Sequence, residues 1–376
     1  MSFSESFKTL DLEKKHLDLE KISKEEVQNR IKKSRLSMDD FPYLISPAAT
    51  DCLEEMAQRA NKLTIQRFGK TMGLFIPLYL SNECYNNCSY CGFSMDLKYA
   101  RKTLSDSEIL QEAGLIKEKG FDHLLILTGE APKTVGVDYI ENAVRLLKPF
   151  FSSIGIEVQP LKTEEYTRLL SSGVDSLTVY QETYHVPSYK KHHITGKKRL
   201  FDHRLDAMDR GGEAGFYRMT IGSLLGLYDW RFEALAIAAH LQHLQQKYWQ
   251  TKLGISIPRI KNMLGDFKVD YPVSDQDMVQ FVTSFRLVFP DLSISISTRE
   301  SAEFRDAMLP LGITDMSAES QTNPGGYSGS EEEAQFELSD HRSLDEILYM
   351  LSKNGYDPMI KNWDRSFIKD NIKDCV

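Results

Sequence analysis

The chain has 376 residues, of which 41% are hydrophobic and 27% are charged, and its formal net charge is −8. This acidic balance argues against a nucleic-acid partner, because surfaces that bind nucleic acid are normally basic. No apolar run approaches the roughly 20 residues that a membrane-spanning helix needs. We therefore expect no nucleic-acid partner and no membrane segment, and a core large enough for one barrel-sized domain with extensions.

The first 70 residues are predicted to form a charged helical extension. Its clearest helical patterns cover residues 11–34 and 51–68. We place the boundary of this N-terminal extension at residue 70, directly before the first strongly apolar run.

From residue 71 onward, short apolar runs alternate with longer amphipathic stretches. Eight runs are predicted as strands: 73–80, 123–128, 155–159, 176–181, 217–223, 254–258, 292–297 and 314–318. Seven stretches between them are predicted as helices: 105–119, 137–151, 163–172, 201–210, 230–248, 274–289 and 301–310. Such alternation is typical of an α/β fold with a parallel sheet. We predict a (β/α)8 TIM-type barrel over residues 71–322.

The remaining residues, 323–376, are predicted as a loop followed by a C-terminal helical tail. The segment 323–333 is rich in glycine and serine and ends in three glutamates, a composition typical of a mobile loop.

Three of the five cysteines, Cys84, Cys88 and Cys91, follow the first predicted strand in one short segment. Three thiolates can hold three irons of a four-iron, four-sulfur cluster and leave the fourth iron open to a small molecule. A structural zinc site needs four protein ligands, and only the distant Cys52 and Cys375 remain as cysteine candidates. The spacing favours the cluster, which implies a reducing, cytoplasmic compartment.

The Cys-x3-Cys-x2-Cys spacing, with Tyr90 directly before the last cysteine, resembles the radical S-adenosylmethionine superfamily. The resemblance implies a [4Fe-4S] cluster whose open iron binds S-adenosyl-L-methionine. It further implies reductive cleavage of that molecule to a 5′-deoxyadenosyl radical, with electrons from a donor such as flavodoxin or ferredoxin.

The reactive groups of a parallel barrel lie at the C-terminal ends of its strands. The second predicted strand ends in Gly129 and Glu130, which resemble the superfamily element that binds the amino group of S-adenosylmethionine. The alternative for Glu130 is a carboxylate at a helix N-terminus. Arg204 is a candidate for the carboxylate of the same cofactor, and a surface ion pair with Asp202 or Asp206 is its alternative.

The fourth predicted strand ends in a dense polar string that includes Gln181, Glu182, Tyr184 and His185. A buried Gln–Glu pair is unfavourable by several kcal/mol unless it is hydrogen-bonded, so we expect a polar cavity ligand there. Gln181 is assigned to cofactor binding. Glu182, Tyr184 and His185 are the candidates for catalytic proton transfer.

The seventh predicted strand alternates serine with apolar residues and is followed by Arg299. Ser297 and Arg299 lie on the face that we expect to point inward. An inward arginine beside a hydroxyl is typical of a clamp for a substrate carboxylate. The alternative is a salt bridge of Arg299 with Glu300 or Glu319.

Two further polar segments receive different interpretations. The eighth predicted strand ends near Ser317 and Ser320, whose hydroxyls we expect to bind another polar part of the substrate. The basic segment 190–199 is interpreted as a solvated connection rather than a binding site.

The cysteine loop and the segments 180–185, 202–208 and 297–300 resemble the aromatic amino-acid lyase branch of the superfamily, over nearly the whole chain. The resemblance is strongest to the tyrosine lyases of thiazole formation in thiamine biosynthesis. It implies that L-tyrosine is cleaved between its α and β carbons to 2-iminoacetate (dehydroglycine) and p-cresol, and that a thiazole synthase protein receives the imine.

Two alternatives stay open. The related tyrosine lyases that mature an iron–iron hydrogenase carry a further C-terminal cluster domain, whereas residues 330–376 contain only Cys375. A non-enzymatic iron–sulfur scaffold would not need polar residues at the ends of the strands.

Overall fold

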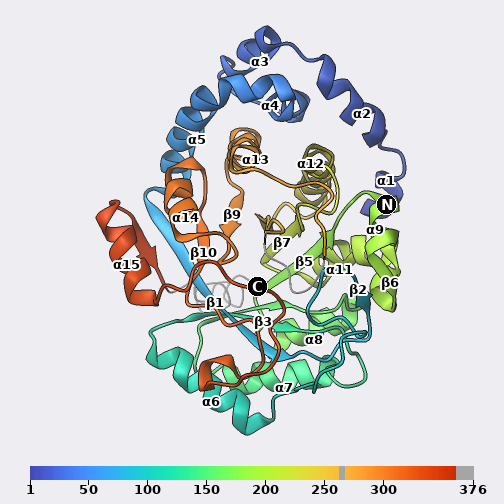
Figure 1. The fold of residues 1–376 in the computed structure, drawn as a ribbon, viewed down its shortest axis with the longest axis vertical. Coiled ribbons are helices and arrows are strands. Elements are labelled where there is room, and N and C mark those ends of the chain that lie inside the picture. Colours follow the sequence, from blue (N-terminus) through green and yellow to red (C-terminus); the bar gives the residue numbers. More distant parts are fainter. Residues whose placement is uncertain (262–266, 361–376) are drawn as a thin grey trace, which may run out of the picture.

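The computed structural model describes residues 1–261 and 267–360, and its centre is a closed barrel of eight parallel strands (Figure 1). The first and last strands pair through Gly73 and Asp315, which closes the ring. The strands are β1 (Thr71–Ser81), β3 (His123–Thr128), β4 (Ser153–Glu157), β5 (Ser176–Glu182), β7 (Arg218–Ser223), β8 (Lys252–Ser256), β9 (Ser293–Ile296) and β10 (Asp315–Ser317). The predicted (β/α)8 barrel is confirmed.

Helices connect consecutive strands on the outside of the barrel, and each of the seven predicted stretches contains at least one (Figure 1). They are α6 (Asp106–Glu118), α7 (Val137–Leu147), α8 (Thr163–Ser172), α10 (Phe201–Leu205), α11 (Ala207–Ala214), α12 (Trp230–Lys247), α13 (Asp275–Val288) and α14 (Ala302–Met308). Serine caps begin several of them: the Ser105 hydroxyl accepts from the N–H of Glu108, and the Ser274 hydroxyl from that of Asp277.

The two faces of the barrel strands differ in chemistry. Successive side chains along a strand point to opposite faces, and the outward set is apolar and packs against the helices. These outward residues are fully buried: Leu74, Ile76, Leu124, Ile126, Leu177, Met219, Ile255, Ile294 and Met316. The inward set lines cavities along the axis and includes the small or polar residues Ser176, Thr178, Thr220, Gly254 and Ser295. Phe75 and Leu125 also line this axis, so its lining mixes apolar and polar side chains, whereas ordinary barrels fill the axis with bulky branched ones.

The N-terminal helices form an arc outside α12 and α13 and reach α14 (Figure 1). They are α1 (Phe3–Phe7), α2 (Leu12–Asp18), α3 (Lys24–Ile31), α4 (Phe41–Ile45) and α5 (Leu53–Phe68). Phe3 and Phe41 are buried in the same hydrophobic cluster as the barrel strands. The extension is therefore packed onto the barrel.

The single helix predicted over residues 11–34 is wrong, because the chain breaks between α2 and α3. Ile22 has an extended backbone, with φ −73° and ψ 128°. Ser23 then caps α3, and its hydroxyl and the Glu26 carboxylate form a reciprocal capping box.

Several short elements were not predicted. Helix α9 (Val186–His192) follows β5, and β2 (Asn87–Cys88) pairs antiparallel with β6 (His193–Thr195). The predicted helical tail contains α15 (Leu344–Lys353), and β11 (Asp357–Met359) adds a parallel strand beside the start of β1. Cys375 lies outside the described residues. No helix of the described chain is long and apolar enough to cross a membrane.

The segment 323–333 was predicted as a mobile loop, but it contains the 3-10 helix η6 (Gly326–Ser328) and is anchored to the barrel at its centre. The Glu112 carboxylate on α6 accepts hydrogen bonds from the backbone N–H groups of Tyr327 at 3.1 Å and Ser328 at 2.7 Å. The Tyr327 hydroxyl also donates to the carbonyl of Pro77 in β1 at 2.7 Å.

Candidate active site

The three cysteines of the predicted cluster site lie on the loop that follows β1. Cys88 is buried, and Cys84 and Cys91 are partly exposed. Burial raises the pKa of the Cys88 and Cys91 thiols, and the ammonium group of Lys198 opposes this increase. A cation beside thiols favours their ionised form, which is the form that binds metal.

The loop fits a cluster better than a single metal ion. Among the described residues, no three His, Cys, Asp or Glu side chains converge as the ligands of one metal ion do. A [4Fe-4S] cluster does not need such convergence, because each thiolate binds a different iron. Cys52 is buried in a separate hydrophobic cluster with α3 and α4, so the structure places it with the core rather than with the loop.

Gly129 and Glu130, at the end of β3, contact the cysteine loop. A Cβ atom on Gly129 would lie 2.1 Å from the carbonyl oxygen of Glu83, so only glycine permits this close approach. The Glu130 carboxylate accepts hydrogen bonds from Asn86 Nδ2 at 2.9 Å and from Arg204 Nη1 at 2.6 Å. Glu130 is not at a helix start, which excludes the alternative interpretation of its carboxylate.

Arg204 joins two buried carboxylates. It lies 3.6 Å from Glu182 as well as bonding to Glu130, and the Lys198 ammonium donates to Glu182 at 2.7 Å. Burial alone would raise the pKa of Glu130 and Glu182, but the charges of Arg204 and Lys198 outweigh it and hold both pKa values below the ordinary one. The surface ion pair that was the alternative for Arg204 is therefore wrong.

Buried polar atoms without partners surround this network. The side-chain oxygens of Thr128 and Ser223 and both polar atoms of Gln181 have no hydrogen-bond partner within the described chain. They lie at the ends of β3, β7 and β5, respectively. Burying a polar group without a partner is unfavourable by about 1–3 kcal/mol. These atoms suit a ligand that carries amino, carboxylate and hydroxyl groups, as S-adenosylmethionine does.

A cavity of about 120 Å³ opens beside this network at the C-terminal ends of the strands, and we call it the C-terminal cavity. It brings together residues from the cysteine loop and from β4, β5, β9 and β10. Among its lining residues are Tyr90, Cys91, Glu157, Tyr180, Glu182, Lys198, Ser297, Arg299, Ser317, Ser320 and Phe336. The predicted substrate residues thus share one chamber with Tyr90 and Cys91. Glu130 and Arg204 do not line it and are linked to it through Glu182, which lies 3.6 Å from Arg204.

Arg299 has no ion pair with any side chain in the described residues. The alternative partners are engaged elsewhere: Glu300 pairs with Arg259 at 2.8 Å, and Glu319 pairs with Lys119. The salt bridge that was the alternative for Arg299 is therefore wrong, and a guanidinium group remains available to a ligand in the cavity.

The serines beside Arg299 offer further hydrogen bonds. The Arg299 guanidinium lies over the Phe336 ring, 3.4 Å from its centroid. Ser320 is buried and its hydroxyl has no partner among the described residues, whereas the Ser317 hydroxyl accepts from the N–H of Thr298 at 3.2 Å. Ser297, Ser317 and Ser320 all line the cavity with Arg299, as the sequence predicted.

Tyr184 lies outside the C-terminal cavity. Glu182 has a positive φ of 71°, which is uncommon for a residue other than glycine. The chain then turns away from the axis, because the Tyr184 N–H donates to the buried Glu233 carboxylate on α12. The Tyr184 hydroxyl is hydrogen-bonded to His240 Nδ1 at 2.9 Å, on the helical side of the strand.

His185 also lies outside the cavity. Its ring stacks on Tyr228 with 3.6 Å between centroids, and its Nδ1 bonds to the Ser188 hydroxyl at the start of α9. Of the three predicted proton-transfer residues, the structure brings only Glu182 to the chamber.

Glu157, at the end of β4, was missed by the sequence analysis. It lines the C-terminal cavity, and burial together with the charge of Glu182 raises its pKa to about 7. Nearby, the Tyr180 hydroxyl donates to Ser256 at 2.6 Å. The available signal was strand alternation, because Glu157 follows Gly155 at the spacing that keeps one face.

Segment 190–199 was interpreted from the sequence as a solvated connection, and this is only partly right. Lys190 and Lys191 are exposed, but His192 and His193 are buried and the Lys198 side chain is only 13% exposed. His193 Nε2 is hydrogen-bonded to the Tyr90 hydroxyl at 2.8 Å, which ties this segment to the cysteine loop.

Comparison with known proteins agrees with this geometry. Residues 78–238 match the Radical SAM superfamily, and residues 256–357 match the Biotin and Thiamin Synthesis associated domain. The chain is 42% identical to 2-iminoacetate synthase of Escherichia coli (strain K12) over 365 residues, which cover 96% of this chain and 97% of that protein. The chain belongs to the 2-iminoacetate synthase family of radical SAM enzymes.

Further relatives support this assignment. The 2-iminoacetate synthase of Salmonella typhimurium (strain LT2) is 41% identical over 96% of this chain and 97% of its own length. The crystal structure of the FeFe-hydrogenase maturase HydG from Carboxydothermus hydrogenoformans superposes with a TM-score of 0.87 and 33% identity. That alignment covers 93% of this chain and 83% of the maturase. Membership of the superfamily implies a [4Fe-4S] cluster and S-adenosylmethionine.

Proposed function

We propose that this protein is a radical SAM tyrosine lyase that cleaves the Cα–Cβ bond of L-tyrosine to 2-iminoacetate and p-cresol for thiazole formation in thiamine biosynthesis. The observation that carries the proposal is the 42% identity to a 2-iminoacetate synthase over nearly the full length of both chains. The chamber is consistent with it, because a cysteine loop and an arginine without an ion pair among the described residues line the same cavity.

In this proposal Cys84, Cys88 and Cys91 hold the cluster. When bound and reduced, the cluster supplies the electron that splits S-adenosylmethionine into methionine and a 5′-deoxyadenosyl radical. Glu130 accepts hydrogen bonds from the amino group of the methionine moiety, and Arg204 donates to its carboxylate. The ion pair between these two residues keeps both in position.

Gln181 and Tyr90 complete the proposed cofactor site. Gln181 offers a buried amide whose donors and acceptor have no partner within the described chain. Tyr90 lies beside the cysteine loop and is fixed by His193. Gly129 allows the end of β3 to approach the loop closely.

Tyrosine is held at the opposite wall of the chamber. Arg299 donates to the substrate carboxylate, and Ser297, Ser317 and Ser320 supply hydroxyls for its remaining polar groups. The Phe336 ring fixes the guanidinium plane from behind. In this proposal the amino group of tyrosine lies between Arg299 and the cysteine loop, and a hydrogen atom is removed from its nitrogen.

Proton transfer falls to Glu157 in this proposal. Loss of hydrogen from the amine and breakage of the Cα–Cβ bond leave 2-iminoacetate and a 4-hydroxybenzyl radical, which needs one electron and one proton to become p-cresol. Glu182 is a poor proton donor, because Lys198 and Arg204 keep it ionised. Glu157, whose pKa is raised to about 7, can hold and donate a proton near neutral pH. Tyr184 and His185 receive no catalytic role.

The partners in this proposal follow from the chemistry. Reducing the cluster and the benzyl radical takes two electrons per turnover, so we expect a small donor such as flavodoxin or ferredoxin. The imine hydrolyses in water, which favours direct transfer to a thiazole synthase protein. A reducing, cytoplasmic location stays a prediction from the oxygen sensitivity of the cluster.

The test is an anaerobic single-turnover assay of reconstituted protein with S-adenosylmethionine, a reductant and tyrosine. Mass spectrometry should detect 5′-deoxyadenosine, p-cresol and glyoxylate, the hydrolysis product of 2-iminoacetate. Deoxyadenosine without p-cresol would overturn the substrate. Cyanide or carbon monoxide among the products would favour a maturase-type lyase, which the 33% identity to the hydrogenase maturase keeps as the second candidate.

A further inference from the structure

The cysteine loop is bordered by the segment that follows β5. Strand β2 of that loop pairs with β6, and α9 leads directly into β6 (Figure 1). The Lys198 N–H donates to Asn86 Oδ1 at 2.9 Å, and the Thr195 hydroxyl donates to Met95 Sδ at 3.7 Å. The exposed residues of segment 190–200 and Met95 therefore form one surface beside the proposed cluster ligands, which we call the outer surface.

Three large apolar side chains of the outer surface are exposed. The exposed fractions are 49% for Met95, 46% for Ile194 and 56% for Leu200. Arg199 connects them, because its Nη1 donates to the Ile194 carbonyl at 3.1 Å and it lines a groove together with Lys190 and Leu200. Apolar side chains that are exposed together, rather than singly, are typical of surfaces that bind other proteins.

The same surface carries positive charge on a chain whose net charge is −8. Residues 186–200 contain five basic residues and no acidic one. Two of them, Lys191 and Lys198, have carboxylate partners. The other three are exposed and have no ion pair among the described residues: Lys190, Lys197 and Arg199. The local charge is therefore opposite in sign to that of the whole chain.

Acidic residues lie at the other end of the cysteine loop. The Gly92 N–H donates to the Gln335 carbonyl at 3.0 Å, which brings the acidic run 331–333 close to that end. At the edge of the outer surface, Asp96 accepts a hydrogen bond from Asn87, so three cations against one carboxylate leave an excess of two positive charges. A negatively charged partner is attracted to the outer surface and repelled from the acidic end, which fixes its orientation.

We propose that the outer surface is the docking site of a small, acidic electron-transfer protein that reduces the cluster. The inference rests on the proposed function, whose chemistry needs one electron for each S-adenosylmethionine that is cleaved. The donor loses this electron and the cluster gains it, and no bond forms or breaks in the transfer.

The position and the size of the outer surface suit such a donor. Electron transfer slows steeply with distance, and Cys88 is paired in register with His193, the neighbour of the exposed Ile194. Complexes between redox proteins have small interfaces, and complementary charge speeds their association. A few exposed apolar side chains with cations around them meet both requirements.

The experiment compares a protein donor with dithionite as the reductant of the cluster-loaded protein. The donors are a flavodoxin and a ferredoxin of acidic net charge. In Lys190→Glu/Lys197→Glu the dissociation constant of the donor should rise at least tenfold, and the rate of 5′-deoxyadenosine formation at subsaturating donor should fall equally. The rate with dithionite should stay unchanged. The matched control is Lys32→Glu/Lys62→Glu, which reverses two exposed lysines of the N-terminal extension and should behave as wild type.

Two further measurements separate charge from apolar contact. Added salt should weaken donor binding by the wild-type protein and have little effect on Lys190→Glu/Lys197→Glu. Ile194→Ser should weaken binding without changing its dependence on salt, because it removes an apolar contact and no charge.

The outcomes that contradict the inference are distinct. Equal donor binding by the wild-type and Lys190→Glu/Lys197→Glu proteins would overturn it, as would an equal fall of the rate with dithionite, which would assign the lysines to the folded site. Loss of binding to a thiazole synthase protein, with donor binding intact, would give the surface to that partner instead. Donor binding that depends on these lysines without p-cresol from dithionite-reduced protein defeats the proposed function alone.

Discussion

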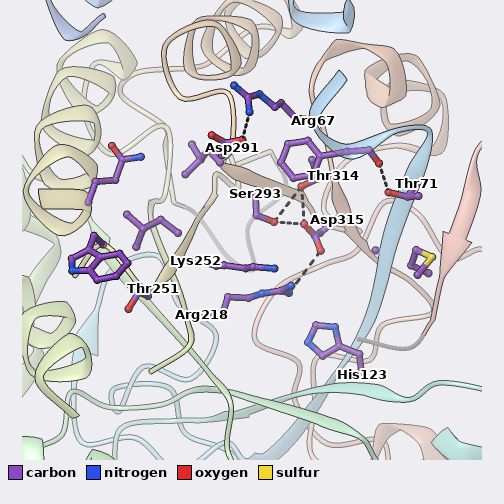
Figure 2. Close-up of a pocket in the computed structure, with 17 residues that line it drawn as sticks. Arg67, Thr71, His123, Arg218, Thr251, Lys252, Asp291, Ser293, Thr314 and Asp315 are labelled. Carbon is purple, nitrogen blue, oxygen red and sulfur yellow. Dashed lines mark hydrogen bonds and ion pairs between the residues drawn. The ribbon is translucent and has the colours of Figure 1, made fainter. Parts of the chain in front are cut away.

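The two ends of the barrel hold their charges differently. At the C-terminal end, Glu130 pairs with Arg204 at 2.6 Å and Glu182 with Lys198 at 2.7 Å, and these four side chains are at most 13% exposed. At the N-terminal end the ion pair of Arg218 with Asp315 is 4.0 Å long and both side chains are more exposed. Short, buried pairs fix groups in advance for a radical reaction. At the N-terminal end, Asp315 is held by the hydroxyls of Ser293 and Thr314 as well as by Arg218 (Figure 2).

The sharpest test of the C-terminal end of the barrel is to remove the cluster. Cys88→Ala should lose most of its iron and all formation of 5′-deoxyadenosine and p-cresol, because Cys88 is the buried central ligand of the loop. Iron analysis, visible absorbance and product analysis by mass spectrometry measure these effects.

Cys52→Ala is the matched control for that variant, because Cys52 is buried in the cluster formed with α3 and α4. It should keep its iron and its activity. Full iron content in Cys88→Ala would contradict the assignment of the loop.

Replacing Arg299, whose guanidinium has no ion pair among the described residues, should have the next largest effect. Arg299→Ala should keep its iron and raise the KM for tyrosine about 10- to 100-fold, since a hydrogen bond to a charged group contributes about 1.5–3 kcal/mol. Arg299→Lys should recover only part of the loss, because a lysine keeps the charge without the planar fork. Steady-state kinetics at saturating S-adenosylmethionine gives the answer, and a wild-type KM in Arg299→Ala would end the clamp assignment.

Much of the C-terminal end of the barrel could be predicted from the sequence. The cysteine spacing and the alternation of runs predicted the loop and all eight strands, and inward serines predicted the position of Arg299. Tyr184 and His185 were misplaced for a definite reason. Side chains alternate between the two faces of a strand only while the strand continues. The positive φ of Glu182 interrupts the strand, so alternation no longer predicts where Tyr184 and His185 point.

Long-range pairing explains the remaining errors. Lys198 is buried because Glu182, 16 residues earlier, needs a counter-charge, and a local charge run cannot reveal that partner. Glu157 was overlooked because it fell inside the predicted strand 155–159, whereas β4 ends at this residue. Its significance comes only from the surrounding cavity, to which several distant strands contribute.

A smaller effect is expected from the carboxylate that binds the methionine moiety. Glu130→Gln should weaken the binding of S-adenosylmethionine about tenfold, because a neutral amide replaces a charge-assisted acceptor. Iron content and the KM for tyrosine should stay near their wild-type values. Equilibrium binding of S-adenosylmethionine to the reconstituted variant measures this, and an unchanged affinity would remove Glu130 from the cofactor site.

The smallest expected effect is on the pH dependence of stability, and it is tested in two buried glutamates whose pKa values are raised equally. Glu157 lines the chamber and Glu233 lies behind it on α12, and burial raises the pKa of each from 4.5 to about 7. For a carboxyl group whose pKa is raised in the folded state, stability is greatest below pH 4.5 and falls as the pH rises through 7. Each shift corresponds to about 3 kcal/mol, so Glu157→Gln and Glu233→Gln should both flatten the dependence of unfolding free energy on pH.

Only Glu157 should also affect the reaction. Because protonated Glu157 supplies the proton of p-cresol in our proposal, p-cresol formation in single turnover should fall up to tenfold per pH unit above pH 7. Glu157→Gln should lose this pH dependence together with most of the rate, whereas Glu233→Gln should keep it. A wild-type pH profile in Glu157→Gln would show that the raised pKa reflects burial alone, and that proximity to the chamber does not make a buried acid part of the reaction.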